Sequence, residues 1–156
     1  MIINKQNGFT IIELFIVIVI MIIISTIVFS SLSSFSDDQA IRNTASDITS
    51  ILNKARQDTL SSLNSTNYGV HFDSDKAVYF IGSVYSSSSS SNKTTLFNQD
   101  VIIPSTGGLD IGGGSEVVFD RLTGDTIGGT IKIQLLSDGS KQKIITISKT
   151  GAISSN

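Results

Sequence analysis

Residues 8–29 read GFTIIELFIVIVIMIIISTIVF, an apolar stretch that contains a single carboxylate, Glu13. No other charged residue follows Glu13 until Asp37. Twenty residues of α-helix span about 30 Å, which matches the hydrocarbon core of a bilayer. Backbone groups in lipid must pair within their own segment, so we expect residues 9–29 to form a membrane-spanning helix.

The polar side chains of this stretch differ in how easily lipid tolerates them. Thr10, Ser25 and Thr26 can bond back to carbonyls of their own helix, so they are compatible with insertion. Glu13 is different, because a buried carboxylate without a partner costs several kcal/mol. One interpretation is that it is tolerated because it lies close to the membrane interface. The other is that it has a function.

The residues before the apolar stretch indicate its orientation. MIINKQNG carries the initiator amine and Lys5 but no acidic residue. Positive flanks stay in the cytoplasm, so we expect the N-terminus to face inward, with the rest of the chain exported across the cell membrane. An ordinary secretory signal would instead be cleaved after the apolar core, where Ser31 and Ser33 offer only a weak small-x-small site.

Composition limits the chemistry that the chain can perform. Its 156 residues allow one compact domain with an appended segment. It has no cysteine, which excludes disulfides, thiolate metal sites and cysteine nucleophiles. A single histidine, His71, gives little support for histidine metal sites or catalytic triads. The net charge of −2 gives no general case for nucleic-acid binding.

Gly8-Phe9-Thr10-Ile11-Ile12-Glu13 resembles the GFTxxE motif of type IV prepilins and type II secretion prepseudopilins. The resemblance implies that a prepilin peptidase cuts after Gly8 and methylates the new N-terminal residue, Phe9. Removing the leader of eight residues from the 156-residue chain would leave 148. The implied partners are prepilin peptidase, other pilin or pseudopilin subunits, the inner-membrane assembly platform and membrane lipid.

The resemblance also implies a role for the carboxylate. Subunits of this superfamily stack their N-terminal helices into a lipid-free filament core. Glu13, the fifth residue of the processed chain, would pair there with the amino group of Phe9 on a neighbouring subunit. Such a buried pair specifies register more than it adds stability. The chain departs from many major pilins, which have a glycine and a proline where this sequence has Ile22 and Ser30.

The segment after the apolar stretch predicts an amphipathic helix. Apolar residues at steps of four and three form one stripe, which consists of Ile41, Ala45, Ile48, Leu52 and Ala55. We expect one long helix over about residues 9–63, with a break near 33–38 as the alternative. Asn64 and Asn67-Tyr68-Gly69 supply stop signals. The predicted parts are a leader (1–8), a transmembrane half-helix (9–29), an amphipathic half-helix (30–66) and a β-rich head (67–156).

The head predicts about five to eight strands, mostly antiparallel, and therefore an α+β fold. YGVHF, KAVYFIGSVY, VVFDRLTG, GTIKIQLL and KQKIITIS carry the strand patterns. The serines of residues 86–91 predict a hairpin tip, and Asp138-Gly139 predicts a tight turn. Ala55-Arg56, the VVFD strand ending in Gly124, and ITISKTGAI resemble the GspH/FimT group of minor pseudopilins and minor pilins.

Other motifs do not predict an enzyme, a metal site or a cofactor. His71 and Asp73 would share one face of a strand as surface neighbours. Asp73-Ser74-Asp75 and the pair Asp120 and Asp125 lack the pattern of a calcium loop, and GGLDIGGG lacks the frame of a phosphate-binding loop. Four lysines could gather on one sheet face, but they would bind DNA only weakly. They are Lys132, Lys141, Lys143 and Lys149.

The sequence therefore predicts a non-enzymatic minor pilin or pseudopilin, a structural subunit of a type II secretion or type IV pilus-like filament. It would be processed after Gly8 and assembled through its hydrophobic N-terminal helix. The first alternative is a DNA-uptake or adhesion minor pilin whose head binds its ligand directly. The second is an unprocessed, membrane-anchored exported protein.

Overall fold

The computed structural model describes residues 8–156, except for the side chains of residues 28–31 and 33. The first seven residues of the predicted leader, and the flanking Lys5 among them, lie outside the described residues. The chain divides into two compact units, Met1–Ser36 and Asp37–Asn156. The second unit contains both the amphipathic helix residues and the strands. From here on, the head means this whole unit, residues 37–156, and not residues 67–156 alone.

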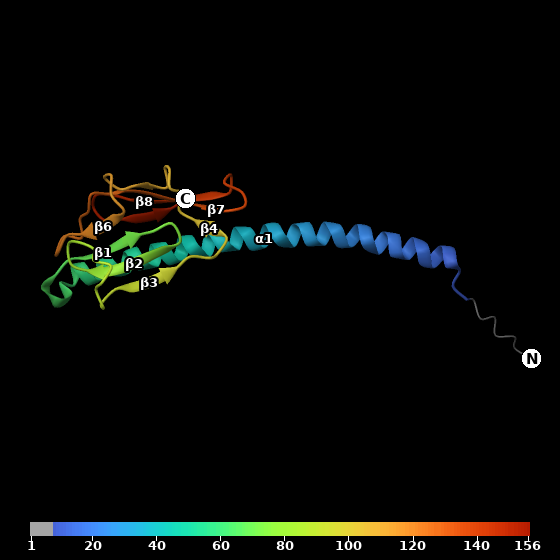
Figure 1. Cartoon of the computed structure of the whole chain (residues 1–156), viewed down its shortest axis with the longest axis horizontal. Coiled ribbons are helices and arrows are strands. Elements are labelled where there is room, and N and C mark those ends of the chain that lie inside the picture. Colours follow the sequence, from blue (N-terminus) through green and yellow to red (C-terminus); the bar gives the residue numbers. More distant parts are fainter. Residues whose placement is uncertain (1–7) are drawn as a thin grey trace, which may run out of the picture. The chain divides into compact units, whose positions relative to one another are not determined.

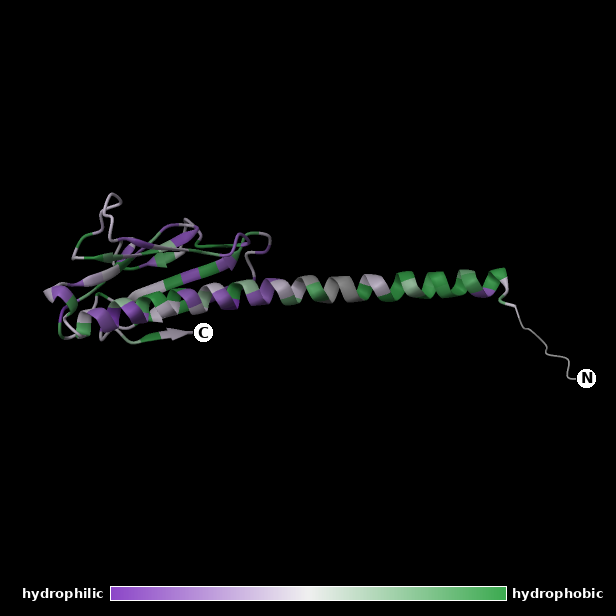
Figure 2. Cartoon of the chain, turned by 90° about the horizontal axis from the view of Figure 1, so that it is seen from below, coloured by the Kyte–Doolittle hydropathy of each residue, from purple (hydrophilic) through white to green (hydrophobic). Residues whose placement is uncertain are grey.

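One helix, α1, runs over Ile11–Leu60 and contributes to both units (Figure 1). Its backbone is helical through residues 30–38, so the alternative of a break in that region is wrong. The apolar colouring of its first part is evident in Figure 2. Within the described part of the chain, no helix combines the length and the apolarity that crossing a membrane requires.

Residues 37–60 of α1 cover the core of the head. The predicted stripe is confirmed, because Ile41, Ala45, Ile48, Leu52 and Ala55 are all buried and belong to the core cluster. Their spacing places them on one helix face, and burying that face supplies most of the stability of such a helix.

The helix ends three residues earlier than the predicted residue 63. Ser62 adopts a left-handed backbone conformation with φ of 52°, which α1 cannot continue through. A short 3₁₀ helix, η1, follows over Leu63–Ser65. The buried Thr59 then accepts a hydrogen bond from the backbone N–H of Tyr68, which ties the end of the helix to the first strand.

The described residues of the head form nine strands in two antiparallel sheets (Figure 1). The first sheet has the order β3-β2-β1-β6, with the strands β1 (Tyr68–Phe72), β2 (Lys76–Ile81), β3 (Lys93–Leu96) and β6 (Glu116–Phe119). The second has the order β4-β7-β8-β9, with β5 also paired to β7. Its strands are β4 (Val101–Ile102), β5 (Leu109–Asp110), β7 (Gly129–Leu135), β8 (Gln142–Ile147) and β9 (Ile153–Ser155).

The α+β prediction is confirmed, but the expected five to eight strands were too few. The strands β4 and β5 have two residues each, which is too short for an alternating pattern to be recognised. The longer β7 was predictable, because Ile131, Ile133 and Leu135 alternate with polar residues and are all buried.

The two predicted turns connect paired strands. Residues 86–91 lie between the antiparallel strands β2 and β3. Asp138 and Gly139 lie between β7 and β8, where the Asp138 carbonyl accepts a hydrogen bond from the N–H of Lys141. Hydrogen bonds from Ser140 to the Asp138 carboxylate hold the pKa of that group below its usual range.

A polar contact links the last turns of α1 to the first sheet. The Asp58 carboxylate accepts hydrogen bonds from the Tyr79 hydroxyl at 2.8 Å and from the Lys54 ammonium at 2.9 Å. Burial alone would raise the pKa of Asp58, but these hydrogen bonds and the nearby positive charges leave that pKa below its ordinary value. Burial and the bond to Asp58 raise the pKa of Tyr79.

We expect Tyr79→Phe to lower the free energy of unfolding by about 1–2 kcal/mol, because it removes a hydrogen bond to a charged group. The contribution of Asp58 is present above its unfolded pKa, about 3.9, and is lost as pH falls through the lower folded pKa. The contribution of Tyr79 is present below its unfolded pKa, about 10, and is lost as pH rises through the higher folded pKa.

Urea unfolding of the full chain in detergent micelles, followed by circular dichroism from acid to alkaline pH, measures both effects. The wild type should lose stability at both ends of that range, whereas Tyr79→Phe should lack the alkaline loss. Tyr85→Phe is the matched control, because the Tyr85 ring stacks on His71 rather than bonding to Asp58. Equal stability of Tyr79→Phe and wild type at neutral pH would contradict the expectation.

Candidate functional site

The predicted processing site precedes the first helical turn. Gly8, Phe9 and Thr10 are exposed and lie outside α1, which begins at Ile11. No atom of the described residues lies within 4 Å of the position that a Gly8 side chain would occupy. Phe9 is 85% exposed. The bond between Gly8 and Phe9 is therefore exposed and precedes the helix.

Thr10 caps α1, a role that the sequence reasoning missed. Its hydroxyl accepts a hydrogen bond from the Glu13 N–H at 3.3 Å, and its carbonyl accepts one from the Leu14 N–H at 3.1 Å. Thr10-x-x-Glu13 has the spacing of a capping box, which was the signal available in the sequence. Glu13 also lies in the first turn, where the helix dipole favours a carboxylate. A carboxylate at position 13 therefore suits the start of α1.

The helix that follows exposes apolar side chains on every side. Exposed large apolar residues continue from Ile11, which is 88% exposed, through Ile24 and Ile27. The hydroxyl groups of Ser25 and Thr26 donate to the carbonyls of Met21 and Ile23, which confirms the expected back-bonding. An exposed apolar surface of this extent marks a site of interaction.

Arg56 joins three parts of the head that are far apart in sequence. It follows the buried Ala55 on α1, and its guanidinium donates to the carbonyl of Thr150 at 3.2 Å. Gly124 and Gly151 are buried beside it, and both have positive φ. A side chain on Gly151 would collide with the Gly124 carbonyl and with Arg56. Ala55-Arg56, the VVFD segment and ITISKTGAI therefore meet at one place.

His71 lies among charged neighbours without the arrangement of a catalytic dyad. Its Nε2 is 3.5 Å from Asp73, and its Nδ1 is 3.5 Å from Glu116 on the opposite side of the ring. The ring stacks on Tyr85 at a centroid distance of 4.0 Å. Lys76 also pairs with Asp73 at 3.4 Å. The expectation of surface neighbours on one strand face is wrong, because β1 ends at Phe72, before Asp73, and the His71 side chain is only 14% exposed.

The acidic turns form local contacts. Asp120 and Asp125 bond to each other through their backbones, with the Asp120 N–H donating to the Asp125 carbonyl at 2.8 Å. Asp73 is engaged by Lys76 and His71. Among the residues that the structure describes, no group of three or more histidine, aspartate or glutamate side chains is arranged to hold a metal ion.

The four lysines that were considered as a possible DNA-binding surface do not lie on one face of a sheet. Lys132 lies between the buried Ile131 and Ile133, so its side chain is on the outer face of β7. Lys143 lies two residues before the buried Ile145, so its side chain is on the same face of β8 as Ile145. It lines a groove beside α1. Two further lysines lie in loops. Lys141 pairs with Asp37 at 3.5 Å and Asp38 at 3.6 Å, and Lys149 lies between β8 and β9.

The helix α1 is apolar in its first part, and its second part belongs to the core of the head together with the antiparallel sheets. Residues 3–29 match the family model of the prokaryotic N-terminal methylation motif. That match covers the predicted processing site and the apolar stretch together. The motif and the fold both resemble those of type IV pilin-like proteins.

Two crystal forms of the type IV minor pilin FimU of Pseudomonas aeruginosa resemble the structure. The TM-scores are 0.54 and 0.57, each at 14% sequence identity. The matches cover 74% and 78% of this chain and 91% and 92% of FimU. At this identity, the likeness establishes the fold. A search of curated protein sequences gave no match.

Proposed function

We propose that the chain is a minor subunit of a type IV pilus-like or type II secretion filament, made as a precursor and processed between Gly8 and Phe9. The observation that carries the proposal is the coincidence of the methylation motif over residues 3–29 with an exposed apolar helix beginning at Ile11. The motif alone would be too short to support the proposal, and the helix alone would indicate only an ordinary membrane anchor.

The local geometry supports cleavage at this position. A protease binds its substrate in an extended conformation, and Gly8, Phe9 and Thr10 precede the helix. Prepilin peptidase would cut on the cytoplasmic side and methylate the amine of Phe9. The leader, residues 1–8, would be lost, and the apolar helix would remain in the mature protein.

The apolar helix has two environments in this proposal. Before assembly, residues 9–29 hold the subunit in the inner membrane, because the apolar sequence continues through residues 28 and 29. After assembly, the helices of other subunits replace lipid around it. The helix exposes apolar side chains on every face. This suits both environments, since lipid and neighbouring helices would each surround the whole circumference of the helix. The inner-membrane assembly platform would transfer the subunit from one to the other.

Glu13 would determine the register of assembly. In a lipid-free filament core, its carboxylate and the Phe9 amine of a neighbouring subunit each need an opposite charge. Glu13 lies one turn from Phe9, so the pair would set a small axial offset between adjacent helices. The head would then serve mechanically, by priming assembly, capping the filament or linking it to exported cargo.

Mass spectrometry of the chain from membranes that contain prepilin peptidase tests the proposal. We expect a protein of 148 residues that begins with methylated Phe9, because eight residues are removed from 156. Membranes without the peptidase are the control and should yield only the full-length chain. A chain that keeps Met1 in the presence of the peptidase would contradict the proposal and favour an unprocessed membrane anchor.

A further inference from the structure

The strand β9 has an unpaired edge. The Asn156 N–H donates to the carbonyl of Ile144, and the Ile144 N–H donates back to Asn156. Bonded pairs alternate along an antiparallel ladder, so Ser154 also bonds to β8, whereas Ile153 and Ser155 do not. The N–H and C=O groups of Ile153 and Ser155 therefore point away from β8. The described residues provide no backbone partner for them.

A groove runs beside this edge, between the sheet and α1. It has a volume of about 510 Å³ and is lined on the sheet side by Ser155 and Lys143. Figure 2 shows the C-terminal strand alongside the helix. The helix side presents a stripe of mostly small side chains, namely Arg42, Ala45, Ser46, Thr49, Ser50 and Asn53. Small side chains leave room for another backbone to lie close to the helix.

The length of the groove suits a short strand. From Arg42 to Asn53, α1 rises by about 16 Å, which corresponds to about five residues of extended chain. An added strand could pair with the outward N–H and C=O groups of Ile153 and Ser155 and place alternate side chains over the helix. This mode of recognition obtains its affinity from backbone hydrogen bonds and its specificity from alternate side chains.

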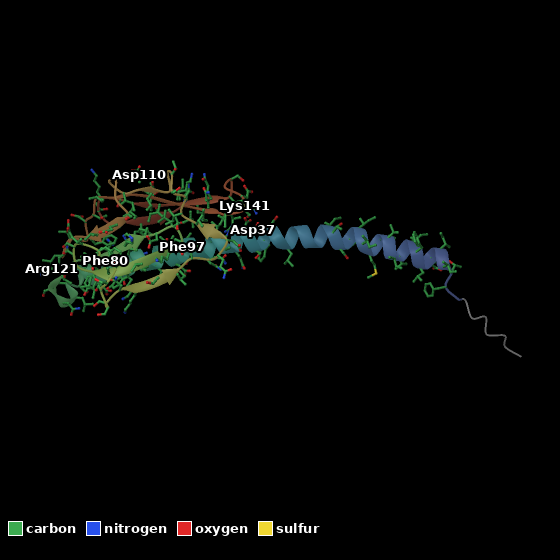
Figure 3. All side chains as sticks on the ribbon, in the orientation of Figure 1. Asp37, Phe80, Phe97, Asp110, Arg121 and Lys141 are labelled. Carbon is green, nitrogen blue, oxygen red and sulfur yellow. The ribbon has the colours of Figure 1, made fainter. Side chains whose placement is uncertain are left out.

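The charge of the groove favours a segment with a negatively charged side chain. Its lining includes two cations, Arg42 and Lys143, and no acidic residue. Neither cation has an ion-pair partner among the described residues. Lys141, by contrast, forms ion pairs with Asp37 and Asp38. Figure 3 shows Lys141 next to Asp37. A carboxylate entering the groove would therefore find unpaired cations, whereas a lysine or arginine would be repelled.

We propose that this groove, the β9 groove, binds an extended segment of a partner protein that adds to β9 as a further strand and places a carboxylate side chain against Arg42 and Lys143. The partner is a flexible peptide segment, because a strand already paired in its own sheet has fewer backbone groups to offer. Binding requires neither processing after Gly8 nor filament assembly, so its test is independent of theirs.

The test uses the full chain in detergent micelles and three fluorescein-labelled peptides of alternating threonine and valine. The peptides differ only in a central glutamate, glutamine or lysine. Fluorescence anisotropy should show saturable binding of the glutamate peptide, about tenfold weaker binding of the glutamine peptide and still weaker binding of the lysine peptide. Raising the salt concentration should reduce the preference for glutamate.

Variants separate the two parts of the proposal. Arg42→Gln combined with Lys143→Gln should abolish the preference for glutamate over glutamine. Lys132→Gln removes a charge from the outer face of β7 and should leave the preference for glutamate over glutamine unchanged. Ser155→Pro removes an outward N–H and should weaken binding of every peptide about tenfold, whereas Ser155→Ala keeps that N–H and should bind like wild type. Circular dichroism confirms that each variant is folded.

Amide hydrogen exchange by NMR provides a direct readout of strand addition. Bound glutamate peptide should slow exchange at Ile153 and Ser155 and leave Ser154 unchanged, since that N–H already bonds to β8. The proposal is overturned if the glutamate peptide does not bind, if Ser155→Pro binds as well as Ser155→Ala, or if protection does not appear at Ile153 and Ser155. Self-association that consumes the same edge would identify a second copy, not an acidic peptide, as the occupant.

Discussion

Gly8→Ala should leave most of the chain at full length in membranes where the wild type is converted to a protein that begins at Phe9. The backbone at Gly8 is exposed and precedes the helix, and a residue without a side chain lets a peptidase approach that backbone closely. One added methyl group in a tight subsite costs about tenfold or more in rate. Processing should therefore slow at least tenfold.

Intact mass after a fixed time in membranes that contain prepilin peptidase gives the ratio of precursor to mature chain. Gly114→Ala is the matched control, because Gly114 is exposed, its backbone φ is not positive, and its nearest neighbours are 3.8 Å from an added Cβ. Processing of Gly8→Ala at the wild-type rate would show that Gly8 is not the recognised residue. It would also remove the assignment of Phe9 as the mature N-terminus.

Glu13→Ala should be processed normally yet enter filaments much less well than wild type. Removing one member of a buried ion pair leaves the other charge unpaired, which costs about 3–5 kcal/mol. Incorporation relative to wild type, measured by quantitative immunoblotting of sheared filaments against membranes, should therefore fall by about a hundredfold to a few thousandfold. Normal incorporation would remove the role of Glu13 in charge pairing.

The capping geometry calls for a second variant at this position. Because the Glu13 N–H bonds to Thr10 in a capping-box sequence, Glu13→Ala also removes a side chain that suits the helix start. Glu13→Gln keeps a capping side chain and removes the charge. If charge pairing governs assembly, the glutamine and alanine variants should be equally defective. If capping governs it, Glu13→Gln should assemble like wild type.

Asp47→Asn controls for the loss of one negative charge. Asp47 is exposed on the same helix but within the head, far along the sequence from Phe9. Its substitution should leave both processing and incorporation unchanged. A comparable loss of incorporation in Asp47→Asn would indicate that net charge, rather than the position of Glu13, affects assembly.

Local sequence patterns were enough to predict the main elements of the fold. The stripe from Ile41 to Ala55 repeats at the helical period, and the strand β7 alternates at the period of a sheet, so each pattern identifies its own buried face. The GFTxxE motif was equally local, since the capping spacing from Thr10 to Glu13 and the exposed Gly8 lie within six residues.

Contacts between distant residues could not be predicted in this way. Nothing near Arg56 in the sequence indicates that its guanidinium reaches Thr150, or that Gly124 and Gly151 must lack side chains to lie beside it. The short strands β4 and β5 also depend on their partner β7, because two residues have no periodicity of their own.

The sequence by itself determined the N-terminal motif, the helix and the α+β class, because periodicity and short motifs act over a few neighbouring residues. The tertiary structure decided which lysines lie on a sheet face and which lie in loops, and how three distant segments meet at Arg56. It also placed the edge of β9 beside Arg42 and Lys143, which have no ion-pair partner among the described residues. Those features depend on strand order and register, which bring together residues far apart in the chain.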